Sequence, residues 1–150
     1  MSKILIRSRT AIEQIQFEPK TALISITDAD WHFAELVSEP DYVLRLAFDD
    51  VDNDIFIGVA NENKNAVAKK YHMLSDEQAK QIANFYAEVH DKVDTIICQC
   101  EHGQSRSAAV AAAILEHKSR SGIKVFAHDK YYPNKAVFNK VLHELKAIER

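Results

Sequence analysis

The chain has 150 residues, of which 47% are hydrophobic and 27% are charged, as in an ordinary globular domain. Its formal net charge of −3 at pH 7 gives no bulk attraction to nucleic acid or anionic lipid, so we expect neither a nucleic-acid nor a membrane partner. Two cysteines cannot form a disulfide framework, and the apolar patch at residues 4–6 is too short for a signal peptide. We therefore expect one domain over residues 1–150, located in the cytoplasm.

The first part of the chain carries three predicted strands. Residues 3–6, 22–27 and 42–48 are short runs rich in strand-forming side chains. The acidic sequence DDVDND, residues 49–54, follows the third run and predicts a turn.

The second part of the chain alternates helices with a strand. Residues 75–93 predict a helix that begins with a capping box, because Ser75 precedes Gln78 by three positions. Its apolar side chains recur on one helix face, at Ala79, Ile82, Ala83, Tyr86, Val89 and Val93. The remaining predicted elements are a buried strand and two helices, at residues 93–99, 107–117 and 134–148. This order predicts an α/β fold, with a central mostly parallel sheet flanked by helices.

The sequence CEHGQSRSAAVAAAI, residues 100–114, lies where the last predicted strand meets the next helix. Sites in open α/β sheets lie at the carboxyl ends of strands. A loop at this position points several backbone N–H groups toward one spot, and together with the helix dipole these groups favour an anion. Gly103 permits a tight turn, and the guanidinium of Arg106 can bind two phosphate oxygens. Because the same field favours the thiolate form of Cys100, the segment predicts phosphoryl transfer to sulfur.

Cys100, five intervening residues and Arg106 match the C-x5-R signature, and in this feature the sequence resembles the cysteine-dependent phosphatases. Gly103 and the continuation Arg106-Ser107 resemble the dual-specificity and tyrosine phosphatase group. The chain also resembles compact bacterial predicted tyrosine phosphatases, through LRLAFDD at residues 44–50 and a Pro-Asn pair at 133–134. The resemblance implies a dual-specificity phosphatase-like fold. It also implies a phosphomonoester hydrolase that forms a cysteinyl-phosphate and needs no metal or other cofactor.

The resemblance also implies roles for individual residues. Cys100 would attack phosphorus, Arg106 would hold the phosphate oxygens, and Ser107 would assist breakdown of the intermediate. The backbone N–H groups that bind phosphate would be those of Glu101, His102, Gly103, Gln104, Ser105 and Arg106. One position departs from the family pattern, since Gln99 stands where the family commonly has His, and an amide has no titratable ring.

The general acid is expected from the acidic turn, because the leaving oxygen needs a proton and the family takes it from a carboxylic acid. Alignment of LAFDD with the family pattern selects Asp50, and Asp49 is the close alternative. The alternating aspartates of residues 50–54 also suggest a calcium loop. That hypothesis fails because Ile55 and Asn61 stand where such a loop needs Gly and Glu.

Several alternatives stay open. A non-catalytic or weakly active phosphate-binding module on the same fold is the main one, supported by Gln99 and by the open choice of acid. A sulfur-transfer or arsenate-type thiol enzyme is the other. Cys98 is either a small buried strand residue or a thiol that captures oxidised Cys100. The motif is compatible with several substrates: phosphotyrosine, phosphoserine or phosphothreonine, a phosphoinositide and an RNA 5′ end. It gives no information on oligomeric state.

Overall fold

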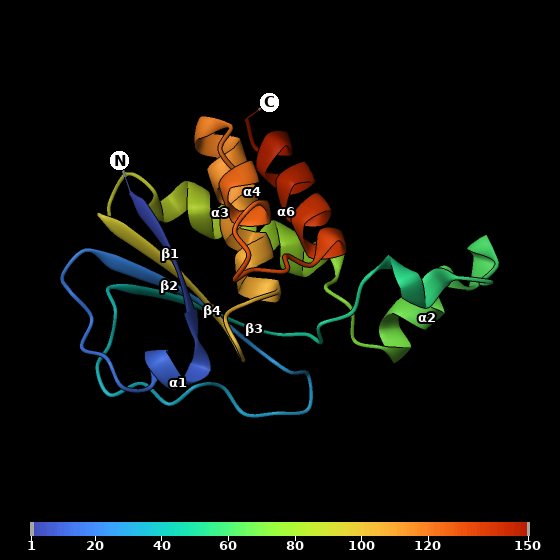
Figure 1. Cartoon of the computed structure of the whole chain (residues 1–150), viewed down its shortest axis with the longest axis horizontal. Helices are drawn as coiled ribbons and strands as arrows, with labels where there is room; N and C mark the ends of the chain where they lie inside the picture. The colour runs from blue at the N-terminus through green and yellow to red at the C-terminus, as the bar shows by residue number, and fades with distance from the viewer. Residues whose placement is uncertain (1, 150) are drawn as a thin grey trace.

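The computed structural model describes residues 2–149, in which four strands form one sheet with helices on both faces (Figure 1). The strand order is β1-β4-β2-β3, and every pair of neighbours is parallel. The strands are β1 (Lys3–Ser8), β2 (Thr21–Thr27), β3 (Tyr42–Ala47) and β4 (Thr95–Cys100). The predicted α/β fold with a largely parallel central sheet is therefore confirmed.

Three long helices cover one face of the sheet, and a short helix with long loops covers the other (Figure 1). The long helices are α3 (Asp76–Val89), α4 (Arg106–Ser119) and α6 (Lys135–Ala147). The helix on the opposite face is α1 (Arg9–Ile12). Two further helices are short: α2 (Lys64–Lys70) extends away from the sheet, and α5 (Ile123–Phe126) packs against α4 (Figure 1). The sequence did not predict the three short helices, which are too brief to carry a periodic apolar stripe.

Helix α3 begins as its sequence predicts. The Ser75 hydroxyl accepts a hydrogen bond from the Gln78 backbone at 3.1 Å, and the Gln78 side chain accepts one from the Ser75 backbone at 3.0 Å. Such a cap stabilises a helix by about 1 kcal/mol. The predicted apolar stripe is buried at all its positions.

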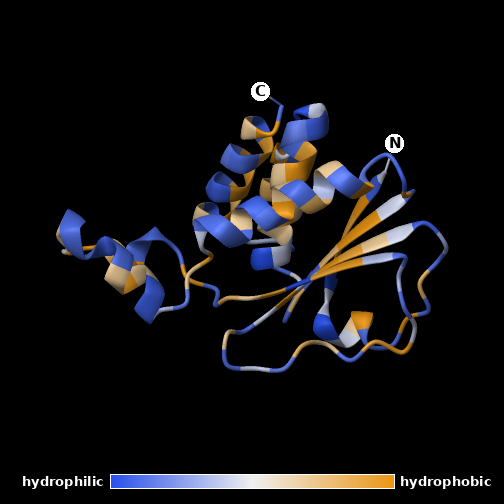
Figure 2. Ribbon diagram, turned by 180° about the vertical axis from the view of Figure 1, so that it is seen from behind, coloured by the Kyte–Doolittle hydropathy of each residue, from blue (hydrophilic) through white to orange (hydrophobic). Residues whose placement is uncertain are grey.

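The core lies mainly between the sheet and the three long helices. Side chains of β2, β3 and β4 meet apolar residues of α3, α4 and α6 there, and a smaller cluster lies beneath the other face around Ile12 and Leu23. Figure 2 shows hydrophobic residues along the strands and along the sides of the helices that face them. Residues 108–114 of α4 are fully buried, as expected for a helix packed on several sides. Small alanine side chains let α4 approach both the sheet and α6 closely.

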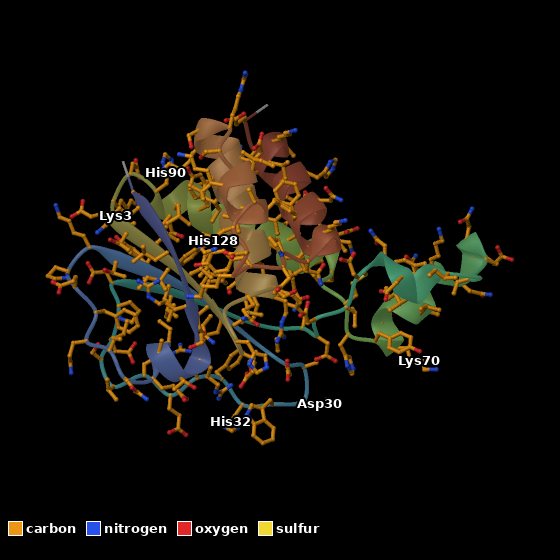
Figure 3. All side chains as sticks on the ribbon, in the orientation of Figure 1. Lys3, Asp30, His32, Lys70, His90 and His128 are labelled. Carbon is orange, nitrogen blue, oxygen red and sulfur yellow. The ribbon has the colours of Figure 1, made fainter. Side chains whose placement is uncertain are left out.

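The segment between β3 and α3 extends away from the rest of the molecule (Figure 1). It contains α2 and two short 3₁₀ turns, η1 (Asn53–Phe56) and η2 (Asn61–Asn63), and none of these elements buries a residue. Lys70 lies on this segment, away from Asp30 and His32 on the loop after β2 (Figure 3). The excursion accounts for the long interval in sequence between Asp50 and Cys100. None of the helices within residues 2–149 is long and apolar enough to cross a membrane.

The parallel sheet brings four loops to one edge, because all its strands end there. The first residues after β1 and β2 are Arg9 and Asp28, residues 48–50 follow β3, and residues 101–105 follow β4. Central strands β4 and β2 are neighbours. Loops at this edge of an open α/β sheet are the usual place for a ligand.

Candidate functional site

The loop after β4 makes a tight turn between a buried sulfur and a buried guanidinium. Cys100 is the last residue of β4 and Arg106 the first of α4, and their exposed fractions are 2% and 4%. Gly103 has φ +68°, and a Cβ there would lie 2.7 Å from the carbonyl carbon of Arg7 and 2.8 Å from the nitrogen of Ser8. Only glycine fits, because both the backbone angle and the contact with β1 exclude a side chain.

The Cys100 sulfur faces the first turn of α4. Its Sγ lies 3.1 Å from the Ser107 hydroxyl, and both side chains are buried. Cys100 also lines a cavity of about 230 Å³, together with Asp50, His102, Gln104, Ser105, Arg106 and Tyr132. Of the loop residues predicted to bind phosphate, His102, Gln104, Ser105 and Arg106 therefore line the cavity that contains the sulfur.

The guanidinium of Arg106 has partners at two of its three nitrogens. Its Nη1 donates a hydrogen bond to the Phe48 carbonyl at 2.6 Å, and its Nη2 lies 2.9 Å from the Asp28 carboxylate. Its Nε is buried and finds no hydrogen-bond partner among residues 2–149. A buried, unpaired guanidinium N–H is costly. Arg106 also lines the cavity, and a guanidinium there is suited to an oxyanion.

The two neighbouring aspartates point to different places. Asp50 lines the cavity, and its Oδ1 accepts hydrogen bonds from the Ser105 hydroxyl at 2.8 Å and the Asn134 amide at 2.9 Å. The Asp49 carboxylate accepts a hydrogen bond from the Ala29 backbone at 2.8 Å instead. The structure thus brings Asp50 to the sulfur's cavity, and Asp49 does not line it.

The start of α6 holds the acidic segment in place. The Asn134 side chain caps α6 by accepting from Val137, and its amide donates to Asp50 and to the Val51 carbonyl. Asp52 accepts hydrogen bonds from two backbone N–H groups in the first turn of α6, at 3.0 and 3.1 Å. These contacts were not predicted from the sequence, although the Pro-Asn pair before the helix was their visible signal.

Gln99 is fully buried and hydrogen-bonded at both ends. Its Oε1 accepts from the Ser25 hydroxyl at 2.5 Å, and its Nε2 donates to the Cys100 carbonyl at 3.2 Å. Ser25 is the residue paired with Gln99 in the register of β2 and β4. The amide therefore fixes the backbone at Cys100 without a titratable ring.

Cys98 lies in the core, and burial, with a smaller contribution from Cys100, raises its pKa to about 12. Its thiol is therefore protonated at neutral pH. This environment is that of a small buried strand residue. Both cysteines are free thiols.

Two predicted loop residues have side chains outside the cavity. The Glu101 carboxylate lies 3.5 Å from Arg9 Nη1, and Ser107, in the first turn of α4, contacts the sulfur at 3.1 Å without lining the cavity. Two residues of the site were not predicted. Asp28 contacts Arg106, and Tyr132 lines the cavity. Among residues 2–149 there is no group of three His, Cys, Asp or Glu side chains arranged to hold a metal.

No protein-family model matches the sequence, and no curated protein matches it. Solved structures do resemble the fold. A mouse protein assigned as a dual specificity phosphatase, complexed with zinc tungstate, superposes with a TM-score of 0.55 at 16% identity, over 97% of this chain and 84% of that one. PTPMT1 in complex with PI(5)P superposes with a TM-score of 0.50 at 14% identity, over 87% of this chain and 79% of that one. The chain therefore has the fold of the dual-specificity phosphatases, as its C-x5-R signature implied.

Proposed function

We propose that the protein is a cysteine-dependent phosphomonoester hydrolase. One observation carries the proposal: Cys100 and Arg106 line the same cavity, and the buried Nε of Arg106 has no hydrogen-bond partner among residues 2–149. A phosphoryl group in this cavity would meet a nucleophile on one side and a positive, hydrogen-bonding group on the other. Phosphoryl transfer needs both, because the transferred group carries negative charge throughout the reaction.

In the first step the Cys100 thiolate attacks phosphorus, so that a sulfur–phosphorus bond forms as the phosphorus–oxygen bond to the leaving group breaks. The backbone N–H groups of residues 101–106 and the Arg106 guanidinium hold the other phosphate oxygens. Asp50 gives its proton to the leaving oxygen. The support for Asp50 is its position in the cavity wall, where hydrogen bonds to Oδ1 fix the carboxyl group.

In the second step water attacks phosphorus and the sulfur–phosphorus bond breaks. Asp50 accepts the proton of that water, and inorganic phosphate leaves. The Ser107 hydroxyl, 3.1 Å from the sulfur, donates a hydrogen bond to the departing thiolate and so favours its release. The cycle returns the enzyme to its starting state without a metal.

A phosphate-binding module without turnover is the second candidate. Gln99 favours it, because the amide cannot supply a charged ring beside the nucleophile. The phosphoinositide bound to PTPMT1 and phosphorylated proteins are both candidate ligands under either function.

Hydrolysis of p-nitrophenyl phosphate by the wild type, Cys100→Ser and Cys98→Ala tests the proposal. We expect Cys100→Ser to lose turnover while it still binds inorganic phosphate. We expect Cys98→Ala, which removes the other buried sulfur, to keep turnover. Full turnover in Cys100→Ser would contradict the proposal, and phosphate binding without turnover in the wild type would favour the binding module.

A further inference from the structure

Glu101 places a carboxylate directly after the nucleophile, in a loop proposed to bind an anion. A negative charge facing a bound phosphate would oppose binding. The Glu101 side chain does not line the cavity. It turns to the other side of the loop, where one carboxylate oxygen lies 3.5 Å from Arg9 Nη1.

Arg9 is a buried cation at the start of α1, and its side chain is 8% exposed. Its backbone N–H donates to the Glu101 carbonyl at 3.1 Å, so Arg9 contacts both the main chain and the carboxylate of that residue. Its Nε lies 3.5 Å from Glu13, whose carboxylate is more exposed. Burial of a guanidinium is unfavourable unless carboxylates compensate it, and Glu101 and Glu13 supply the opposite charge at 3.5 Å each. Arg9 Nη2 and Glu101 Oε2 are buried without a hydrogen-bond partner among residues 2–149.

The same arginine is connected to the far end of the loop. Arg9 Nη1 donates to the Thr27 hydroxyl at 3.1 Å, and Thr27 is the last residue of β2. The next residue, Asp28, holds Nη2 of Arg106 at 2.9 Å. Glu101 is thus connected through Arg9 to Thr27, and Arg106 is bound directly to the next residue, Asp28.

We propose that Arg9 is a positioning residue that neutralises Glu101 and holds its carboxylate away from the bound phosphate. The proposal rests on the proposed function, because it assumes that the loop binds an oxyanion. Without Arg9 the Glu101 charge is uncompensated and free to approach the anion. One such charge about 6 Å from a bound dianion weakens binding about tenfold even at the dielectric constant of water.

The test is the affinity of inorganic phosphate for the full chain, measured by isothermal titration calorimetry. We expect Arg9→Met to bind phosphate about tenfold more weakly, and the double variant Arg9→Met/Glu101→Gln to return to within about threefold of the wild type. Arg45→Met is the matched control. It removes the same unit of charge from an exposed position on β3 and should leave affinity unchanged.

The rescue separates a charge effect from a packing effect. If Arg9→Met binds phosphate as the wild type does, or if the double variant stays as weak as Arg9→Met, the proposal is wrong. If Arg9→Met does not fold, Arg9→Lys replaces it. Lysine keeps the charge, so affinity should stay within about threefold of the wild type, and a tenfold loss in the folded Lys variant would overturn the proposal. Absence of phosphate binding in the wild type would instead contradict the proposed function.

Discussion

Replacement of Asp50 by asparagine tests the proposed proton transfer from this residue to the leaving oxygen. Asp50 Oδ1 accepts hydrogen bonds from Ser105 and Asn134, and the asparagine Oδ1 can accept both. The acidic segment also keeps its second attachment, because Asp52 still caps α6. Asp50→Asn should therefore fold and bind phosphate as the wild type does, and it should lack only the acid.

The expected loss depends on the leaving group. General acid catalysis contributes about 10²–10⁴-fold, which is about 2.7–5.4 kcal/mol of the activation free energy. A phenyl or alkyl phosphate needs the full contribution, because its leaving oxygen is strongly basic. A p-nitrophenyl phosphate scarcely needs a proton, so we expect its loss to stay below about tenfold.

The assay is kcat/KM for phenyl phosphate and p-nitrophenyl phosphate, measured on the wild type, Asp50→Asn and Asp49→Asn. The second variant is the matched control, because Asp49 bonds to the Ala29 backbone and does not line the cavity. A large leaving-group-dependent loss in Asp49→Asn alone would transfer the role of acid to Asp49. An equal loss on both substrates, or none, in Asp50→Asn would refute the role given to Asp50.

Three further predictions concern the loop. Arg106→Lys should weaken phosphate binding and turnover, because an ammonium group cannot reproduce the forked contacts of the guanidinium, and unchanged kinetics would count against the oxyanion site. Gly103→Ala should lower both the melting temperature and phosphate affinity, because the new Cβ would lie 2.7 Å from β1 backbone. Gly58→Ala, at a similar φ of +75° with nothing within 4 Å, should lower the melting temperature less and leave affinity intact, and equal effects of the two changes would argue against the close contact. Iodoacetamide at neutral pH should label Cys100 before Cys98, whose pKa is raised to about 12 by burial, and mass spectrometry that finds equal labelling would contradict this.

The helices and strands could be predicted where their signals are local. Ser75 and Gln78 form the expected capping box, because both residues lie within one helical turn. The observed strand β4 extends one residue beyond its prediction, to Cys100, because pairing of Cys100 with Ser8 of β1 continues the sheet. Strand ends depend on neighbouring strands, which the sequence of one segment does not reveal.

The phosphate-binding loop could be predicted because its defining residues are contiguous. The contacts that hold it could not, because they join residues far apart in sequence. Asn134 and Asp50 are separated by 84 positions, and Ser25 and Gln99 by 74. These pairs depend on the fold as a whole. Asp28 and Arg9 therefore looked like ordinary polar residues, and the Pro-Asn pair at residues 133–134 gave no indication of its partner Asp50.

The most direct test of the account is to trap the phosphorylated enzyme. The wild type is mixed with p-nitrophenyl phosphate and quenched during turnover in denaturant at alkaline pH, where the sulfur–phosphorus bond is stable, and the peptides are analysed by mass spectrometry. The account predicts phosphate on the sulfur of Cys100. Steady turnover with Cys100 unmodified throughout, or with phosphate on a different residue, would contradict it.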